Sequence, residues 1–326
     1  MLRRRTVLTL FVVGVVPAFA TVNGLVAVTR TTRAQLEREW ASRAAAAAEA
    51  GRSSEAADDY YTAQVYARDH GRYRLDLARA LIAAGRASEA RAELDTLWAD
   101  APGSGEVNLE LGRVSAGEGD VDGAVRYLHG AIDGAWQHDP RTARHGARLE
   151  LARLFADRGL LPQAQAELGI LLADPPIDPR AAALAGAIAF AQSDYRMAAE
   201  RLREARTGGA LDPAGEQMLE VSGRALALDP DAHGLTSRER VRRLVRLFTI
   251  ALAASRRCPS DAAAPMRARL EAAAPQVNER ALARDPDAVD ATFELLAAAA
   301  GAVDAACPPA DPEERAVALV LRRART

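Results

Sequence analysis

Lysine is absent from this chain of 326 residues, so all 42 of its basic residues are arginine. Aromatic residues make up only 5 % of the sequence, and there are two cysteines, too few for a disulfide-dense scaffold. The 44 acidic residues bring the net charge to -2, whereas nucleic-acid-binding proteins are usually basic overall. Hydrophobic residues account for 49 %, which excludes an intrinsically disordered chain.

Alanine, by contrast, is abundant, at about a quarter of the sequence. Alanine is the best helix former, and β-branched residues, which favour strands, are sparse outside the N-terminus. The composition therefore predicts an all-α protein.

The N-terminal segment is the longest uncharged stretch of the chain. Residues 6–28 carry no charge, and as a helix they would span about 34 Å, enough to cross a bilayer core. Arg3, Arg4 and Arg5 precede the stretch, while Arg30 and Arg33 follow it, and this excess favours an N-terminus on the inside. We expect a single-pass anchor in residues 1–29, in the cell inner membrane, with the rest of the chain in the periplasm or outside.

A cleaved signal peptide is the alternative for this segment. Ala18 and Ala20 are small residues at the positions that signal peptidase requires for cleavage after Ala20, which would release an exported soluble protein. The apolar stretch continues to Val28, however, which favours an uncleaved anchor. A buried core helix is a third alternative, and three preceding arginines are poorly explained by it. A short linker, residues 29–38, would follow the anchor.

A repeat with a nearly constant period occupies the middle of the chain. Turn residues recur with spacings of 34, 34, 40 and 34 residues, and a small residue lies seven positions before each of them. An alanine lies five positions after each turn residue, and a large residue lies four positions further on. The turn residues are Gly51, Gly85, Gly119, Gly159 and Ser193; the alanines are Ala56, Ala90, Ala124, Ala164 and Ala198; the large residues are Tyr60, Leu94, Leu128, Leu168 and Leu202.

This pattern resembles the tetratricopeptide repeat, a helix-turn-helix unit of 34 residues, in a membrane-anchored bacterial type of protein. The resemblance implies a right-handed α-solenoid of about five units in residues 30–206, whose first helices line a concave groove that holds peptides or partner helices. Three departures are an aromatic start only in the first unit (Trp40), an insertion at 134–140, and Ser193 in place of glycine. An alanine-rich coiled coil is disfavoured because the turn glycines interrupt every heptad run.

The period fades in residues 207–326. Helical patterns there cover residues 213–228, 237–257, 262–283, 287–306 and 312–324. We expect degenerate repeats and a helical cap, because a solenoid without a cap would expose an apolar face.

Cys258 and Cys307 both lie in this last region, and each directly precedes a proline. In an exported protein two such cysteines are expected to form a disulfide, and the alternative is two separate buried thiols. A metal or redox pair is not favoured, because there is no Cys-x-x-Cys spacing.

Motifs of enzyme chemistry are missing from the sequence. There is no nucleophile elbow, zinc-protease helix, phosphate loop or dinucleotide-binding motif, so we expect no enzyme activity, no cofactor and no small-molecule substrate. His129, His138 and His145 lie near one another in sequence, but their spacing matches no usual zinc site, and we expect solvated loop histidines and no metal.

Three arginines recur at one position of the repeats. Arg79, Arg113 and Arg153 each end a Leu-acid-Leu-small-Arg motif, and in the register of the resemblance they would project into the groove as a ladder that binds carboxylates of a partner. The alternative is pairing with the acid three residues earlier, or with a neighbouring repeat. Those acids are Asp76, Glu110 and Glu150.

A second basic stripe is formed by Arg238, Arg242 and Arg246, which recur every four residues beside an apolar stripe. Basic amphipathic helices bind anionic lipid or partner proteins, and the alternative is an ordinary solvated helix face beside a core stripe.

Taken together, these patterns predict a membrane-tethered, extracytoplasmic scaffold or assembly factor that binds proteins and not nucleic acid. Tethering would raise the local concentration of partners near the membrane. The alternative is a permanent structural subunit of an envelope complex, which large apolar patches on the outer face of the array would favour.

Overall fold

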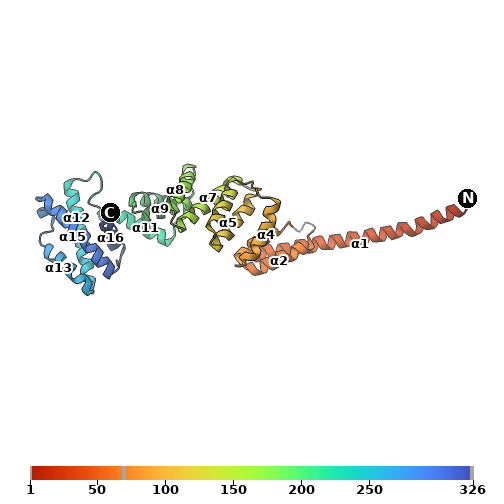
Figure 1. The fold of residues 1–326 in the computed structure, drawn as a ribbon, viewed down its shortest axis with the longest axis horizontal. Helices are drawn as coiled ribbons and strands as arrows, with labels where there is room; N and C mark the ends of the chain where they lie inside the picture. Colours follow the sequence, from red (N-terminus) through yellow and green to blue (C-terminus); the bar gives the residue numbers. More distant parts are fainter. Residues whose placement is uncertain (1, 68–70, 324–326) are drawn as a thin grey trace. The chain divides into compact units, whose positions relative to one another are not determined.

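The computed structural model describes residues 2–67 and 71–323, and the chain divides into two compact units, residues 1–154 and 155–326. Helices dominate both units (Figure 1), and the described residues contain no β-strand beyond an isolated bridge between Ser104 and Ala135. The prediction of an all-α protein is therefore confirmed.

The first unit consists of pairs of antiparallel helices joined by tight turns. Its helices are α1 (Leu2–Glu49), α2 (Ser53–Tyr66), α3 (Arg74–Ala83), α4 (Ala87–Asp100), α5 (Gly105–Glu118), α6 (Val121–Asp133) and most of α7 (Pro140–Asp157). The C-terminal part of α1 packs with α2 as the first pair, and each later pair packs on the one before it.

Helix α1 is a single helix of 48 residues that extends well beyond α2 (Figure 1). Residues 29–38, which the sequence suggests as a linker, are part of this continuous helix, because no proline or glycine interrupts them. Most side chains of the apolar segment 6–28 lie outside the described part of the structure. Within the described part, no helix combines the length and the apolar character needed to cross a bilayer.

The turns between paired helices confirm the repeat register. The four turn glycines adopt φ between 71° and 82°, in the left-handed region, and Ser193 adopts the same conformation at φ 63°. The next residue then donates its N–H back to a carbonyl five positions earlier, as in the 2.9 Å bond from Arg52 to Ala47. Asp194 and Ala189 form the same bond after Ser193, so serine preserves the turn.

Small residues at the helix contacts explain the alanine pattern. The five alanines of the second helices are completely buried. Gly186, at the small position of a first helix, lies so close to the opposite helix that a Cβ there would be 2.6 Å from Cγ of Leu202. These positions therefore let paired helices approach closely, and the leucines fill the remaining space.

The insertion at 134–140 folds against the loop of the preceding repeat. The backbone of Ala135 accepts a hydrogen bond from Gly105 at 2.8 Å and donates one to Gly103 at 2.9 Å. The indole of Trp136 donates to the carbonyl of Ala131 at 2.8 Å. The extra residues thus extend the connection without breaking the helix pairing.

The second unit continues the helix pairs and ends in a different packing arrangement. Its helices are α8 (Leu161–Ala173), α9 (Pro179–Ala191), α10 (Tyr195–Thr207), α11 (Pro213–Leu228), α12 (Ser237–Arg257), a 3-10 turn η1 (Asp261–Ala263), α13 (Ala264–Ala273), α14 (Glu279–Leu282), α15 (Pro286–Ala306) and α16 (Pro312–Arg323).

The core of this unit joins α11, α12, α15 and α16, with Leu247 and Leu296 fully buried in it. Helix α16 returns to pack on α11, far from it in sequence. The helix expected over residues 262–283 is broken into η1, α13 and α14. Pro275 follows the end of α13, and Asn278 caps α14 by accepting the N–H of Ala281 at 2.9 Å.

Candidate functional site

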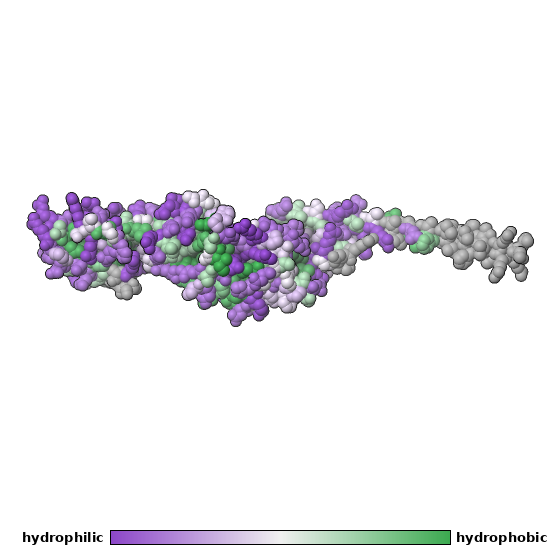
Figure 2. All heavy atoms as spheres, turned by 90° about the horizontal axis from the view of Figure 1, so that it is seen from above, coloured by the Kyte–Doolittle hydropathy of each residue, from purple (hydrophilic) through white to green (hydrophobic). Residues whose placement is uncertain are grey.

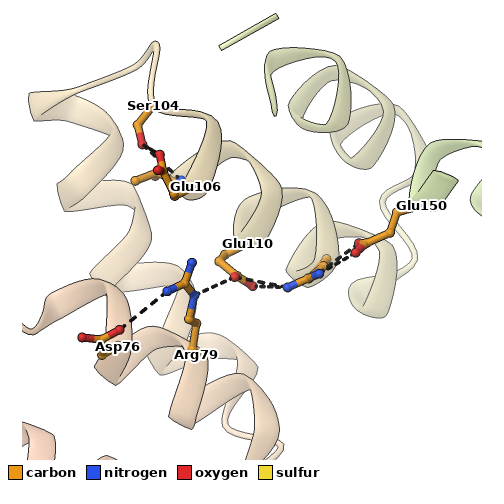
Figure 3. Close-up of polar contacts among 8 residues, drawn as sticks. Asp76, Arg79, Ser104, Glu106, Glu110 and Glu150 are labelled. Carbon is orange, nitrogen blue, oxygen red and sulfur yellow. Dashed lines mark hydrogen bonds and ion pairs between the residues drawn. The ribbon is translucent and has the colours of Figure 1, made fainter. Parts of the chain in front are cut away.

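The arginine ladder of the first unit is an alternating row of charges across α3, α5 and α7 (Figure 3). Arg79 of α3 lies 3.6 Å from Asp76 and donates from Nε to Glu110 of α5 at 2.9 Å. Arg113 of α5 donates to the same Glu110 at 3.1 Å. It also reaches Glu150 of α7, with its Nε 3.0 Å from Oε2 and a second contact through Nη2.

Glu110 is the centre of this row. Its side chain is only 3 % exposed, whereas those of Arg79 and Arg113 are 44 % and 41 % exposed. A buried carboxylate needs compensation by opposite charge, and the two guanidinium groups provide it. The hydrogen bonds with Glu150, opposed by burial, raise the pKa of Arg113 above its usual value.

Arg153 does not join the row. It lies on α7 at the position that matches Arg79 and Arg113, its side chain is exposed, and no carboxylate among the described residues is at ion-pair distance from it. In the fifth repeat the positions of the acid and the arginine are occupied by Leu184 and Ala187. The structure thus pairs Arg79 and Arg113 with acids of their own repeat and of the next repeat, whereas Arg153 has no such acid among the described residues. Binding of a partner by the three arginines stays a prediction.

A second buried acid, which the sequence patterns do not single out, attaches α1 to the array. Glu37 of α1 is 8 % exposed and accepts hydrogen bonds from Arg72 at 2.9 Å and from the hydroxyl of Tyr73 at 3.0 Å. The hydroxyl bond and burial raise the pKa of Tyr73, with burial the larger cause. Because both donors directly precede α3, these bonds fix α1 to the second repeat.

Glu106 connects the start of α5 to the insertion. It accepts the N–H of Gln137 at 2.8 Å and the hydroxyl of Ser104 at 3.1 Å. Burial alone would raise the pKa of Glu106, but the hydrogen bonds outweigh it and hold that pKa below its ordinary value. None of the described residues forms a group of three His, Cys, Asp or Glu that could hold a metal ion.

The basic stripe of α12 is largely used inside the second unit. Arg242 pairs with Glu239 of the same helix at 2.9 Å, and Arg246 pairs with Glu313 of α16 at 2.7 Å. Arg238 is exposed, and no carboxylate of the described residues lies at ion-pair distance from it. Arg246 therefore helps to hold α16 in place; a role of the stripe in binding lipid or a partner stays a prediction.

Cys258 and Cys307 meet at the end of the α12 and α15 helices. Their sulfur atoms lie 2.06 Å apart, which is a disulfide bonding distance, and their Cα atoms are 5.8 Å apart. Cys258 is 1 % exposed, and its carbonyl accepts a hydrogen bond from Arg267 of α13 at 2.7 Å. The link closes a segment that contains η1, α13, α14 and α15. This segment is also held on α12 by packing and by two ion pairs, Arg240 with Asp290 of α15 and Arg256 with Glu271 of α13.

A groove of about 400 Å³ on the second unit is also outside the residues that the sequence patterns indicate. It lies between α9, α11 and α16, and its position depends on the return of α16 to α11. Its walls are mainly apolar, with two arginines from α16. The lining residues are Phe190, Ala214, Gln217, Met218, Val221, Pro309, Arg315, Ala318, Leu319 and Arg322.

The comparison with protein families supports the interpretation of the repeats. Residues 47–114 match the family described as tetratricopeptide repeat. No curated protein matches the chain. Among solved structures, the chain is similar to one described as the crystal structure of the APC/C hetero-tetramer Cut9-Hcn1, with 16 % sequence identity and a TM-score of 0.44. The match covers 87 % of this chain and 48 % of that chain, so this chain spans about half the length of the solved protein.

Proposed function

We propose that this chain is a membrane-anchored scaffold that holds partner proteins on an extracytoplasmic tetratricopeptide array. The observation that carries this proposal is the continuity of α1, which contains the apolar segment and ends as the first helix of the array. On the described part of α1 outside the array, Phe19, Val22, Leu25 and Val28 are between 59 and 69 % exposed, and Figure 2 shows hydrophobic surface on that stretch. Such side chains are stable in a lipid environment.

The attachment of α1 makes the anchor part of the scaffold. Glu37 is held by Arg72 and Tyr73, and residues 29–38 are helical. A helix is stiffer than a flexible linker, so the first repeats would keep a defined position relative to the membrane. This position would favour partners that are themselves embedded in the membrane or bound to it.

Export across the membrane is supported by two features. More arginines directly precede the apolar segment than directly follow it, which favours an N-terminus on the inside. The pairing of Cys258 with Cys307 suits an oxidising compartment outside the cytoplasm. Cleavage after Ala20 would separate the array from the membrane, and the intact mass of the mature chain distinguishes these two outcomes.

Topology is tested by fusing alkaline phosphatase, which is active only outside the cytoplasm, to the C-terminus in a Gram-negative bacterial host. We expect phosphatase activity in the membrane fraction. A matched fusion that lacks residues 6–28 should lose both the activity and the membrane association. Activity in the soluble periplasmic fraction would indicate a cleaved signal peptide instead of an anchor. An inactive full-length fusion would contradict export.

Partner binding by the ladder is expected to depend most on Arg153. Its guanidinium is exposed and lacks an acid in the described structure, whereas Arg79 and Arg113 are already paired. A carboxylate of a partner could extend the alternating row beyond Glu150. Arg153→Glu should therefore remove partners from crosslinked membrane complexes without unfolding the array. Arg158→Glu, an equal charge change at an exposed position outside the row, is the matched control; identical partners with both variants would contradict a binding role.

A permanent structural subunit is the second candidate function. It is favoured by large apolar side chains that are exposed on second helices of the repeats, such as Tyr61 and Val65 of α2 and Trp98 of α4. Permanent interfaces are rich in such residues. If the chain is a subunit of this kind, it should be absent from membranes as a free protein and should be degraded when its partners are missing.

A further inference from the structure

The groove between α9, α11 and α16 combines an apolar floor with a positively charged rim. Phe190, Met218, Val221 and Leu319 supply apolar surface from all three helices. Arg315 and Arg322 stand on α16 at the edge. Among the described residues that line the groove, none carries a carboxylate.

The acids of α16 face another helix. Glu313 pairs with Arg246 of α12 at 2.7 Å. Glu314 contacts Arg257 of α12 and accepts the N–H of Ala310 at 2.9 Å. The carboxylates of these two residues therefore hold α16 on α12, and neither is at ion-pair distance from Arg315.

Arg315 is the cation of the rim that has the weakest protein contacts. Its side chain is exposed, and its hydrogen bond to Gln217 across the groove is long, at 3.5 Å. No carboxylate of the described residues lies at ion-pair distance from it. The guanidinium fork can therefore donate two hydrogen bonds to an incoming carboxylate in a bidentate arrangement.

We propose that this groove is a second docking site, for a peptide segment of a partner protein that presents an apolar side chain followed closely by carboxylates. The apolar side chain would contact Phe190, Met218 and Leu319, and the acids would bind Arg315. The volume of about 400 Å³ is large enough for one aromatic or branched side chain with its backbone. An anchoring side chain in an apolar pocket with charges at the rim is a common way to combine affinity and specificity.

A peptide fits this groove because its walls come from three neighbouring helices: α9 is the first helix of the fifth repeat, α11 contacts both α9 and α10, and α16 packs on α11. The inference rests on the proposed function only in that both take the chain to bind proteins. It uses neither the membrane anchor nor the ladder of the first unit, so each proposal can fail independently.

The test is a binding measurement with labelled short peptides and the full-length chain, purified in mild detergent. Each peptide contains one Phe, Leu, Ile, Met or Trp followed by two aspartates. Its two controls carry lysines instead of the aspartates, or alanine instead of the apolar residue. We expect the apolar-acidic peptides to bind at least about tenfold more tightly than either control, as measured by fluorescence anisotropy.

Two variants connect this binding to the groove. Arg315→Glu reverses the charge at the rim and should weaken the affinity for the acidic peptides at least about fivefold, with no loss of affinity for the lysine peptides. Ala214→Trp, at an exposed position of the lining, should fill the groove and weaken binding about tenfold or more. Arg203→Glu makes the same charge change at an exposed position of α10 that does not line the groove, and its affinity should equal that of the wild type.

Three results would overturn the proposal. The first is equal affinity for acidic and lysine peptides, or no binding of any acidic peptide. The second is an unchanged affinity of Arg315→Glu, which remains informative even if Ala214→Trp does not fold. The third is a concentration-dependent dimer that Ala214→Trp converts into monomer, because the occupant would then be a second copy of this chain.

Discussion

The two compact units carry different side chains at matching positions of the repeat. In residues 1–154 the first helices carry an acid and an arginine three positions apart, and these side chains pair from one repeat to the next. In residues 155–326 the matching positions of α9 are Leu184 and Ala187, and the nearby groove is apolar. The helical repeat therefore determines the spacing of the helices, while a few positions on the first helices determine what the surface can bind.

The units also differ in how they are stabilised. The first relies on closely packed small residues and on a row of ion pairs around Glu110. The second has a larger core in which α16 closes the end of the array, and the link between Cys258 and Cys307 crosses that region. A unit at the end of an array lacks one neighbour, and these features compensate for the missing contacts.

Removal of the disulfide should have the largest effect, and it should affect only the second unit. Cys258 and Cys307 are separated by 49 residues, and a loop of that size corresponds to about 4 kcal/mol at most in the chain-entropy model. We expect the double variant Cys258→Ser with Cys307→Ser to lose about 2–4 kcal/mol in its free energy of unfolding.

The tryptophans provide the control for this prediction. Trp40, Trp98 and Trp136 are the three tryptophans of the chain, and all lie in residues 1–154. In a urea titration the circular dichroism of the double variant should therefore show an earlier transition, while the tryptophan fluorescence stays unchanged. An equal shift of both signals would mean that the two units unfold together, and the contrast between them would not extend to stability.

Two glycines at equivalent positions compare the packing of the two units directly. A Cβ on Gly186 would lie 2.6 Å from Cγ and 3.1 Å from the backbone nitrogen of Leu202, whereas on Gly112 the distances to Leu128 would be 2.9 Å and 3.5 Å. A leucine side chain can move, but a helix backbone cannot move as easily. We expect Gly186→Ala to lower the free energy of unfolding by about 1–2 kcal/mol.

Gly112→Ala should be nearly neutral, because alanine raises helix propensity by about 0.5–1 kcal/mol and offsets a milder clash. Its effect is measured by tryptophan fluorescence, and that of Gly186→Ala by circular dichroism. Equal losses in the two variants would show that side-chain packing, not the distance to the backbone, controls tolerance at this position.

Much of the repeat architecture could be predicted from the sequence because its determinants are local. The turn glycines need a left-handed conformation, and the buried alanines recur at fixed offsets, so position in sequence translates directly into position in space. The same regularity indicates pairing of Arg79 and Arg113 with acids as one of two alternatives. Proline at position 275, which divides the helix expected over 262–283, is also visible in the sequence.

The groove could not be predicted in this way, because it depends on contacts between distant segments. Arg315 and Gln217 face each other although 98 residues separate them. No periodicity indicates that α16 returns to α11, since an amphipathic helix shows which face is buried but not against what it packs. The helical continuation of α1 through residues 29–38 was missed for another reason: polar residues such as Thr31 and Thr32 resemble a linker, yet their hydroxyls donate to the carbonyl of Val28 within the helix.

The smallest expected loss of stability is that of Glu110→Gln, which tests whether the row of ion pairs stabilises the first unit. Glu110→Gln keeps the size of the side chain but removes the charge that faces Arg79 and Arg113. Breaking a buried ion pair by removing one partner often lowers stability by about 3–5 kcal/mol, but both arginines are over 40 % exposed and can be hydrated. We therefore expect a loss of about 1 kcal/mol in the fluorescence-detected transition.

Asp76→Asn is the matched control for Glu110→Gln, because Asp76 stands at the exposed end of the same row. Its side chain is 46 % exposed and 3.6 Å from Arg79, so its loss should change the free energy of unfolding by less than about 0.5 kcal/mol. High salt should shrink the difference between Glu110→Gln and wild type only slightly, since a buried charge is poorly screened. If Glu110→Gln is as stable as the control, the row adds no net stability. The role of its charges would then be a different one, and the geometry favours binding of a partner's carboxylate next to Arg153.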